Sequence, residues 1–113
     1  MTKPRVSAFS DLTFQPRFEY GDQAQAAQIC GADDLVALGA GFGRMTNARF
    51  PWTISYDEVL LVVEGELTVH TADGALTAGP KDTIFLPKGT ALEYEAQDAL
   101  IFYAIHPANW AET

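Results

Sequence analysis

The stretch Trp52-Thr-Ile-Ser-Tyr-Asp-Glu-Val-Leu-Leu-Val-Val-Glu-Gly-Glu-Leu-Thr-Val69 decides the fold of this chain. It is rich in β-branched, aromatic and aliphatic residues, which favour β-strands. Gly65 interrupts it once, between two acids, and a glycine at this point can take the positive φ that a tight turn requires. The stretch therefore predicts two strands, residues 52–64 and 67–72, joined by a turn.

A single carboxylate lies on the apolar row of the first predicted strand. Because side chains alternate along a strand, one face carries the even positions Trp52, Ile54, Tyr56, Glu58, Leu60 and Val62. A bare buried charge is very costly, so Glu58 needs a partner, water, a metal ion or a proton. The opposite face is also largely apolar, and we expect another sheet or a second subunit to cover it, a homodimer being the simplest arrangement. That face is formed by Asp57, Val59, Leu61 and Val63.

The composition predicts one globular domain and excludes some classes of partner. The chain has 113 residues, which suits a single core. Its net charge of −8 argues against non-specific binding to nucleic acid or to an anionic membrane surface. No apolar run approaches the length of a membrane span, no apolar signal segment follows Met1, and the one cysteine, Cys30, cannot form an internal disulfide. We expect a cytoplasmic protein.

The rest of the chain divides into an N-terminal arm, residues 1–33, and a β-rich core, residues 34–113. Within the arm, Asp22 can cap a short helix from Gln23 to Ile29, and a strand fits the same segment. Short strands at intervals of about ten residues in the core indicate a sandwich or a barrel. The predicted strands cover residues 35–44, 52–64, 67–72, 75–78, 83–86, 91–96 and 99–105.

The two halves of this β region resemble the two motifs of the cupin family. Glu58 and Gly65 have the spacing of the first motif, and Asp82, Pro87 and Gly89 fit the second. Four segments add a more specific resemblance, to the cupin of ethanolamine utilization protein Q, over roughly residues 35–110. These segments are Tyr56-Asp-Glu58, Val63-Glu-Gly-Glu66, Phe85-Leu-Pro-Lys-Gly89 and Pro107-Ala-Asn-Trp110. The resemblance implies an all-β double-stranded β-helix, a jelly-roll-like barrel.

The departures from the cupin motifs concern the metal ligands. Of the four usual ligand positions only Glu58 is kept, and one carboxylate cannot hold Zn, Fe or Ni alone. We therefore expect no cofactor and no standard metal site, while an improvised site that includes Glu58 stays open. The two histidine positions of the first motif carry either Trp52 and Ile54 or Pro51 and Thr53. In the second motif, Leu92 takes the histidine position, Ala96 takes the asparagine position and Lys81 replaces the first glycine.

Six residues are candidates for a site inside the barrel. Glu58 and Tyr56 are the candidate catalytic residues, since an acid in a pocket can exchange protons. Tyr94, Tyr103, Trp52 and Phe50 are candidate ligand-binding residues. The alternative is structural: a partly solvated, hydrogen-bonded acid and aromatic side chains that only fill the core. His70 and His106 are expected at the surface.

Three functions follow as hypotheses. The first is a metal-free cupin of ethanolamine utilization that binds an unidentified small molecule. The second, implied by the family resemblance, is an enzyme of the acetate kinase type, although the sequence has no glycine-rich phosphate loop and no carboxylate cluster placed for Mg²⁺. The third is a scaffold role in a metabolic compartment, carried by the arm and the acidic surface. Whether the protein is an enzyme stays open.

Overall fold

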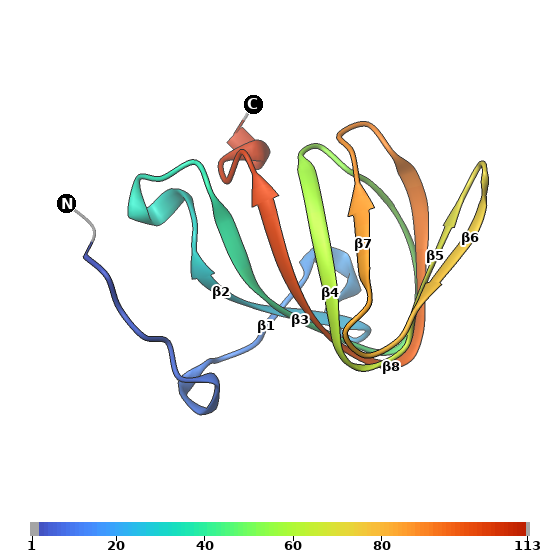
Figure 1. Cartoon of the computed structure of the whole chain (residues 1–113), viewed down its shortest axis with the longest axis horizontal. Helices are drawn as coiled ribbons and strands as arrows, with labels where there is room; N and C mark the ends of the chain where they lie inside the picture. Colours follow the sequence, from blue (N-terminus) through green and yellow to red (C-terminus); the bar gives the residue numbers. More distant parts are fainter. Residues whose placement is uncertain (1–2, 113) are drawn as a thin grey trace.

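The computed structural model describes residues 3–112, and its strands form one antiparallel sheet that curls on itself (Figure 1). The main strand order is β1-β2-β3-β8-β4-β7, while β5 pairs with β6 and with β8. The strands are β1 (Gln15–Pro16), β2 (Ala24–Cys30), β3 (Gly39–Thr53), β4 (Asp57–Gly65), β5 (Leu67–Thr71), β6 (Gly74–Ala78), β7 (Thr83–Leu86) and β8 (Ala91–His106). Short 3₁₀ turns are η1 (Phe9–Asp11), η2 (Phe18–Tyr20), η3 (Ala32–Asp34) and η4 (Trp110–Glu112).

Two long strands, β3 and β8, form the spine of the barrel. They pair from Gly39 opposite Ile105 to Thr53 opposite Ala91. The register is the same on both sides of Asn47, which is itself left out of the pairing, and its φ of 44° lies in the left-handed region that asparagine tolerates better than most residues. On one side of this bend β8 also pairs with β5, and on the other side it pairs with β4. The bend therefore lets one strand take part in both walls of the barrel.

The core lies between these walls. Its largest fully buried side chains come from β4, β5, β7 and the corner before β4, and all are apolar, as the alternation of strand side chains requires. They are Ile54, Leu60, Leu67, Leu86, Val62 and Val69, each at most 1% exposed. The all-β class predicted from the sequence is confirmed. No helix among residues 3–112 has the length and apolar character needed to cross a membrane.

The predicted strand over residues 52–64 is wrong as a single element. β3 ends at Thr53 and β4 begins at Asp57, with a corner between them. The corner forms because Ile54 bonds to the next turn: its N–H donates to the Thr90 carbonyl at 2.9 Å, and its carbonyl accepts from the Gly89 N–H at 2.7 Å. The alternation nevertheless continues through the corner, because every even position from 54 to 62 is buried.

Other boundaries also differ from the prediction. Residues 91–96 and 99–105 form one strand, β8, since Asp98 pairs with Thr46 and the chain bends there without breaking. The strand predicted from residue 35 begins only at Gly39, because Leu35 takes a φ of 61° at the end of η3. Of the two alternatives for the segment after Asp22, the structure has the strand, β2.

The N-terminal segment is joined to the sheet. β2 pairs with β3 through Ala27 and Phe42, and the two residues of β1 pair with β2. Between β1 and β2 the chain turns through η2, which brings Arg17 and Phe18 to the barrel. Arg5 ties the preceding segment to this part of the fold, since its guanidinium donates to the Ile29 carbonyl at 2.6 Å.

Candidate functional site

The barrel contains a cavity of about 130 Å³. Buried side chains, among them Glu58, Tyr56 and Tyr94, form its inner wall. Its outer part is formed by side chains that solvent reaches, such as Phe18, which is 60% exposed. The six residues predicted as a site, Phe50, Trp52, Tyr56, Glu58, Tyr94 and Tyr103, all line this one cavity.

Glu58 is the buried acid of the cavity. It lies near the start of β4, a strand paired on both sides, opposite Leu86 of β7 and Ile105 of β8. Burial raises the pKa of the Glu58 carboxyl from 4.5 to about 7, although the positive charge of Arg17 and a hydrogen bond from Tyr94 act in the opposite direction. A carboxyl with this pKa exchanges a proton readily at neutral pH.

Three tyrosines surround this acid. The Tyr94 hydroxyl donates to Oε1 of Glu58 at 3.4 Å, a long hydrogen bond, and the Tyr56 hydroxyl accepts from Nε1 of Trp52 at 3.2 Å. Burial raises the pKa of Tyr56 to about 12, and raises the pKa of Tyr94 and of Tyr103 as well. All three hydroxyls therefore keep their protons at neutral pH and offer the cavity hydrogen-bond donors.

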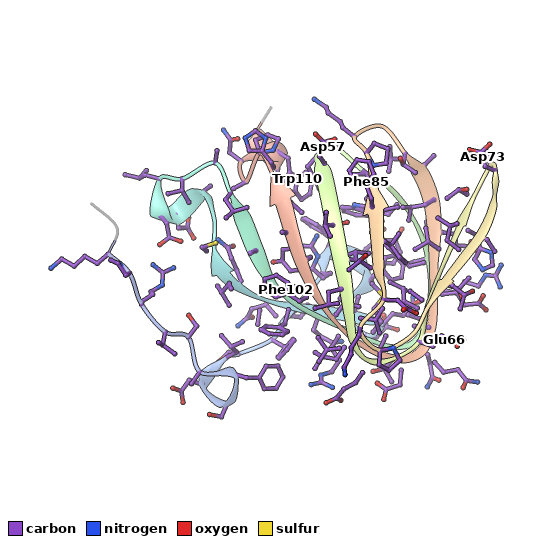
Figure 2. All side chains as sticks on the ribbon, in the orientation of Figure 1. Asp57, Glu66, Asp73, Phe85, Phe102 and Trp110 are labelled. Atoms are coloured by element: carbon purple, nitrogen blue, oxygen red, sulfur yellow. The ribbon has the colours of Figure 1, made fainter. Side chains whose placement is uncertain are left out.

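Aromatic rings form the entrance to the cavity. We call Phe18, Trp52 and Trp110, together with the inner-wall ring of Tyr56 that Trp110 contacts, the mouth cluster. Phe18 stacks on Trp52 with ring centroids 5.4 Å apart. Trp110 meets Trp52 edge-on at 6.1 Å and contacts Tyr56 at 4.9 Å. Figure 2 shows Trp110 in the C-terminal turn, beside the end of β8. The turn after β8 and the segment before β2 thus meet over the barrel.

Phe50 is more buried than Phe18 and Trp52 of the mouth cluster. It is stacked on Tyr20 at 4.5 Å, it is 5.5 Å from the ring of Tyr94, and only 6% of it is exposed. Its packing on both sides restricts its rotation. Phe50 is therefore a fixed wall of the cavity.

Arg17 is a charged cavity residue that was not predicted from the sequence. Its guanidinium carbon lies 5.0 Å from the ring centroid of Phe18 and 6.0 Å from that of Trp52. Its charge lowers the pKa of Glu58 and partly offsets the raised pKa of the three tyrosines. The available signal was an arginine among aromatic residues, Phe14, Phe18 and Tyr20, in a segment without strand periodicity.

The two histidines lie outside this site. Nε2 of His70 lies 2.8 Å from Oε1 of Glu95, in a surface network in which Arg49 pairs with Glu93 and Glu95. His106 is exposed at the end of β8. Across residues 3–112, no three His, Cys, Asp or Glu side chains are grouped so that they could hold a metal ion.

The curled antiparallel barrel has the cupin fold. Its fold matches the cupin domain of an XRE-family transcriptional regulator from Enterobacter cloacae, with a TM-score of 0.65 at 14% identity, over 74% of this chain and 96% of that chain. It matches the crystal structure of an ethanolamine utilization protein Q from Salmonella typhimurium LT2 more fully. There the TM-score is 0.85 at 31% identity, over 92% of this chain and 86% of that chain.

Within the cupins, the chain belongs to the family of ethanolamine utilisation protein EutQ, whose family model matches residues 13–112. The match begins well before residue 35, so the resemblance extends further toward the N-terminus than the sequence motifs predicted. A relative from Escherichia coli K12, named acetate kinase EutQ, is 42% identical over 79 residues, which are 69% of this chain and 34% of the relative. This chain thus spans about a third of that relative.

Proposed function

We propose that this chain binds a small molecule in the cavity of its barrel, as a cupin of ethanolamine utilisation without the standard histidine metal site. The observation that carries the proposal is a titratable carboxyl, Glu58, only 6% exposed and facing a cavity. Perturbed acids in cavities are typical of functional sites. The volume of about 130 Å³ is similar to that of a cavity that holds benzene, so the ligand has roughly six non-hydrogen atoms.

The cavity residues divide into three roles under this proposal. Glu58 is the group for general acid–base chemistry, because a pKa of about 7 lets it both donate and accept a proton near neutral pH. Tyr56 and Tyr94 orient polar atoms of the ligand through their hydroxyls, and Tyr103 adds a third donor. Phe50 and Trp52 provide apolar contact surface.

The donor set does not fit the metal of other cupins. The histidine positions of the cupin motifs hold Leu92 and either Trp52 and Ile54 or Pro51 and Thr53, and none of these side chains can replace imidazole. An improvised site through Glu58 is tested by measuring the metal content of the purified protein beside Glu58→Gln. Stoichiometric metal that disappears in the variant would replace our proposal with a metal site.

Thermal-shift screening with small aldehydes, carboxylates and amines tests the proposed binding. We expect at least one compound to raise the unfolding midpoint of the wild type and to have no effect on Glu58→Gln. Glu64→Gln is the matched control, since Glu64 is an exposed acid on the same strand, and it should respond like the wild type. If no compound shifts the wild type, the proposal is wrong.

The name of the relatives supports one alternative, a phosphoryl transfer to acetate. Two facts count against assigning it to this chain: the sequence lacks a glycine-rich phosphate loop, and the chain covers about a third of the Escherichia coli relative. Formation of ADP from ATP and acetate by the purified chain, lost in Glu58→Gln, would favour this alternative over simple binding.

We also propose that two copies associate through the outer face of β4 and β7. Val59 and Phe85 pair across these strands and are 46% and 65% exposed, and Val63 on the same face is 38% exposed. Figure 2 shows Phe85 on the outside of β7. Neighbouring exposed apolar side chains of this kind are typical of association surfaces.

A further inference from the structure

The turn that follows β8 lies outside the strands of the barrel. β8 ends at His106, which pairs with Asp57 of β4, and Pro107 has no N–H with which to continue the pairing. Residues 107–112, which we call the strap, belong to no strand and lie at the same end of the barrel as the loop before β3 (Figure 1). The strap can therefore move while the strand pairing of the barrel stays intact.

A backbone hydrogen bond ties the strap to the loop before β3. The Ala108 N–H donates to the Ala37 carbonyl at 2.8 Å, and the next carbonyl, that of Leu38, accepts from Sγ of Cys30 at 3.7 Å. This loop is exposed, since Leu35 is 94% and Leu38 is 52% accessible to solvent. Backbone hydrogen bonds between exposed, non-strand segments open at a lower free energy than those of core strands. The tether of the strap thus opens more readily than the pairing of β8.

Trp110 is the side chain with which the strap covers the cavity. Its ring centroid lies 4.9 Å from that of Tyr56, 6.1 Å from that of Trp52 and 6.2 Å from that of Phe18. Tyr56 belongs to the inner wall and is only 4% exposed. Ala108 and Trp110 themselves line the cavity. The strap is therefore part of the wall that separates solvent from the inner residues.

The opposite side of the mouth is held more firmly. Phe18 belongs to the turn between β1 and β2, which contains three backbone hydrogen bonds. The Arg17 N–H donates to the Ala24 carbonyl at 3.0 Å, and the Arg17 carbonyl accepts from the Tyr20 N–H at 2.9 Å. The Gln23 N–H donates to the Tyr20 carbonyl at 2.9 Å. Of the two turns that meet over the barrel, the strap is thus the one that opens more easily.

We propose that the strap is the lid of the cavity: a molecule reaches the inner wall when the strap releases Ala37 and swings Trp110 outward, and the strap then closes again. The inference rests on the proposed binding function only for what passes through the mouth. Closure over a bound molecule would exclude water from the inner wall and slow the release of the molecule.

Trp110→Ala and Trp110→Phe test whether the strap covers the mouth. Each variant leaves Trp52 as the single tryptophan of the sequence, so the emission comes from the mouth alone. Because phenylalanine keeps a ring over Tyr56 and alanine does not, we expect acrylamide to quench Trp52 at least twofold more strongly in Trp110→Ala. Thermal melts show whether both variants are folded. Equal quenching in the two folded variants would overturn the proposal.

Cys30 reports access to the cavity itself. It is the one cysteine of the chain, it is half-buried, and it lines the cavity. Iodoacetamide, a small neutral reagent, alkylates this thiol at a rate that mass spectrometry follows. We expect alkylation at least fivefold faster in Trp110→Ala than in the wild type, with Trp110→Phe close to the wild type. Equal rates in all three proteins would show that the strap does not close the cavity.

A second pair of variants tests the tether and leaves Trp110 in place. Ala108→Pro removes the N–H that donates to the Ala37 carbonyl, whereas Ala108→Ser keeps it. Neither changes a strand residue, so both should fold even if Trp110→Ala does not. We expect faster alkylation of Cys30 in Ala108→Pro alone. Alkylation as slow in Ala108→Pro as in Ala108→Ser would refute the tether and with it the lid.

The measurements separate this inference from the function on which it rests, because neither quenching nor alkylation needs a ligand. Unchanged quenching and alkylation overturn the lid and leave the proposed binding to the thermal-shift screen. If the strap controls alkylation and no compound shifts the wild type, the lid stands and the binding function is wrong.

Discussion

The hydroxyl of Tyr94 lies 3.4 Å from Oε1 of Glu58, and each of these two side chains is 6% exposed. The phenol comes from β8 and the acid from β4, so the contact joins two strands of the barrel inside its core. Because the hydrogen bond is long, it offsets little of the desolvation of the carboxyl, whose pKa stays raised, at about 7. The native protein therefore carries an electrostatic penalty whenever Glu58 is ionised.

The first prediction concerns the pH dependence of stability. The pKa of Glu58 is about 7 in the folded chain against 4.5 for the free group, so the folded state binds the proton more tightly. Proton binding by Glu58 therefore adds roughly 3 kcal/mol to the free energy of unfolding. This stabilisation is complete below pH 4.5 and is lost as the pH rises through 7. Urea unfolding at pH 5 and pH 8.5 should show Glu58→Gln more stable than the wild type at pH 8.5 only.

Glu64→Gln is the control for that experiment, since it removes one exposed acid from the same strand. It should leave the pH dependence of the wild type nearly unchanged. If Glu64→Gln and Glu58→Gln behave alike between pH 5 and pH 8.5, the burial of Glu58 does not have the energetic effect described here.

The inner wall of the cavity was predictable because strand alternation is a local property. Tyr56, Glu58 and Leu60 still point into the barrel although the chain turns a corner at Ile54. They were predicted from the alternation of even and odd positions alone. The corner itself was not predictable, because the apolar pattern runs through it. Its cause is a pair of hydrogen bonds to Gly89 and Thr90, which are distant in sequence.

The entrance of the cavity was only half predictable. Trp52 was identified because it continues the apolar row of the central stretch. Arg17 was not, because its place over the cavity depends on how the chain turns between β1 and β2. No hydrophobic periodicity in residues 14–23 predicts the path of this turn. The sequence also does not distinguish a half-buried arginine that stacks on aromatic rings from an exposed arginine.

The second prediction uses the two tryptophans of the chain, Trp52 and Trp110, which both belong to the mouth cluster. Phe18→Ala removes the ring stacked on Trp52, a contact worth about 1 kcal/mol. We expect red-shifted tryptophan emission and stronger quenching by acrylamide. Phe9→Ala is the control, because Phe9 contacts Phe14 and Phe42 and neither tryptophan. Equal quenching in both variants would contradict the arrangement of the mouth.

The third prediction tests association through the outer face of β4 and β7. Phe85 is 65% exposed beside Val59, so Phe85→Lys places a charge in the middle of that face. We expect a dimer for the wild type in sedimentation velocity, and a dissociation constant at least tenfold weaker for Phe85→Lys. Leu76→Lys is the control, since Leu76 is 48% exposed but lies on β6. A wild type that is monomeric at all concentrations, or variants that behave alike, would refute association through this face.

The fourth prediction concerns Lys81, which stands where the second cupin motif has its first glycine. Its φ is 74°, in the left-handed region, and its N–H donates to the Val62 carbonyl at 2.8 Å, so the turn before β7 fixes this conformation. A residue with a Cβ is disfavoured there by about 1–2 kcal/mol, and glycine is not, although glycine loses more entropy on folding. Lys81→Gly should therefore stabilise the chain by about 1 kcal/mol and raise the thermal midpoint by about 4 °C.

Lys88→Gly separates this backbone effect from the loss of a lysine. Lys88 is exposed in the turn after β7 and is not among the residues with positive φ, so glycine there only adds freedom to the unfolded chain. We expect its midpoint to fall slightly or to stay unchanged. Both variants remove the same charge. A higher thermal midpoint in Lys81→Gly alone would therefore show that the positive φ of Lys81 destabilises the native chain. A similar gain in both would assign the effect to charge.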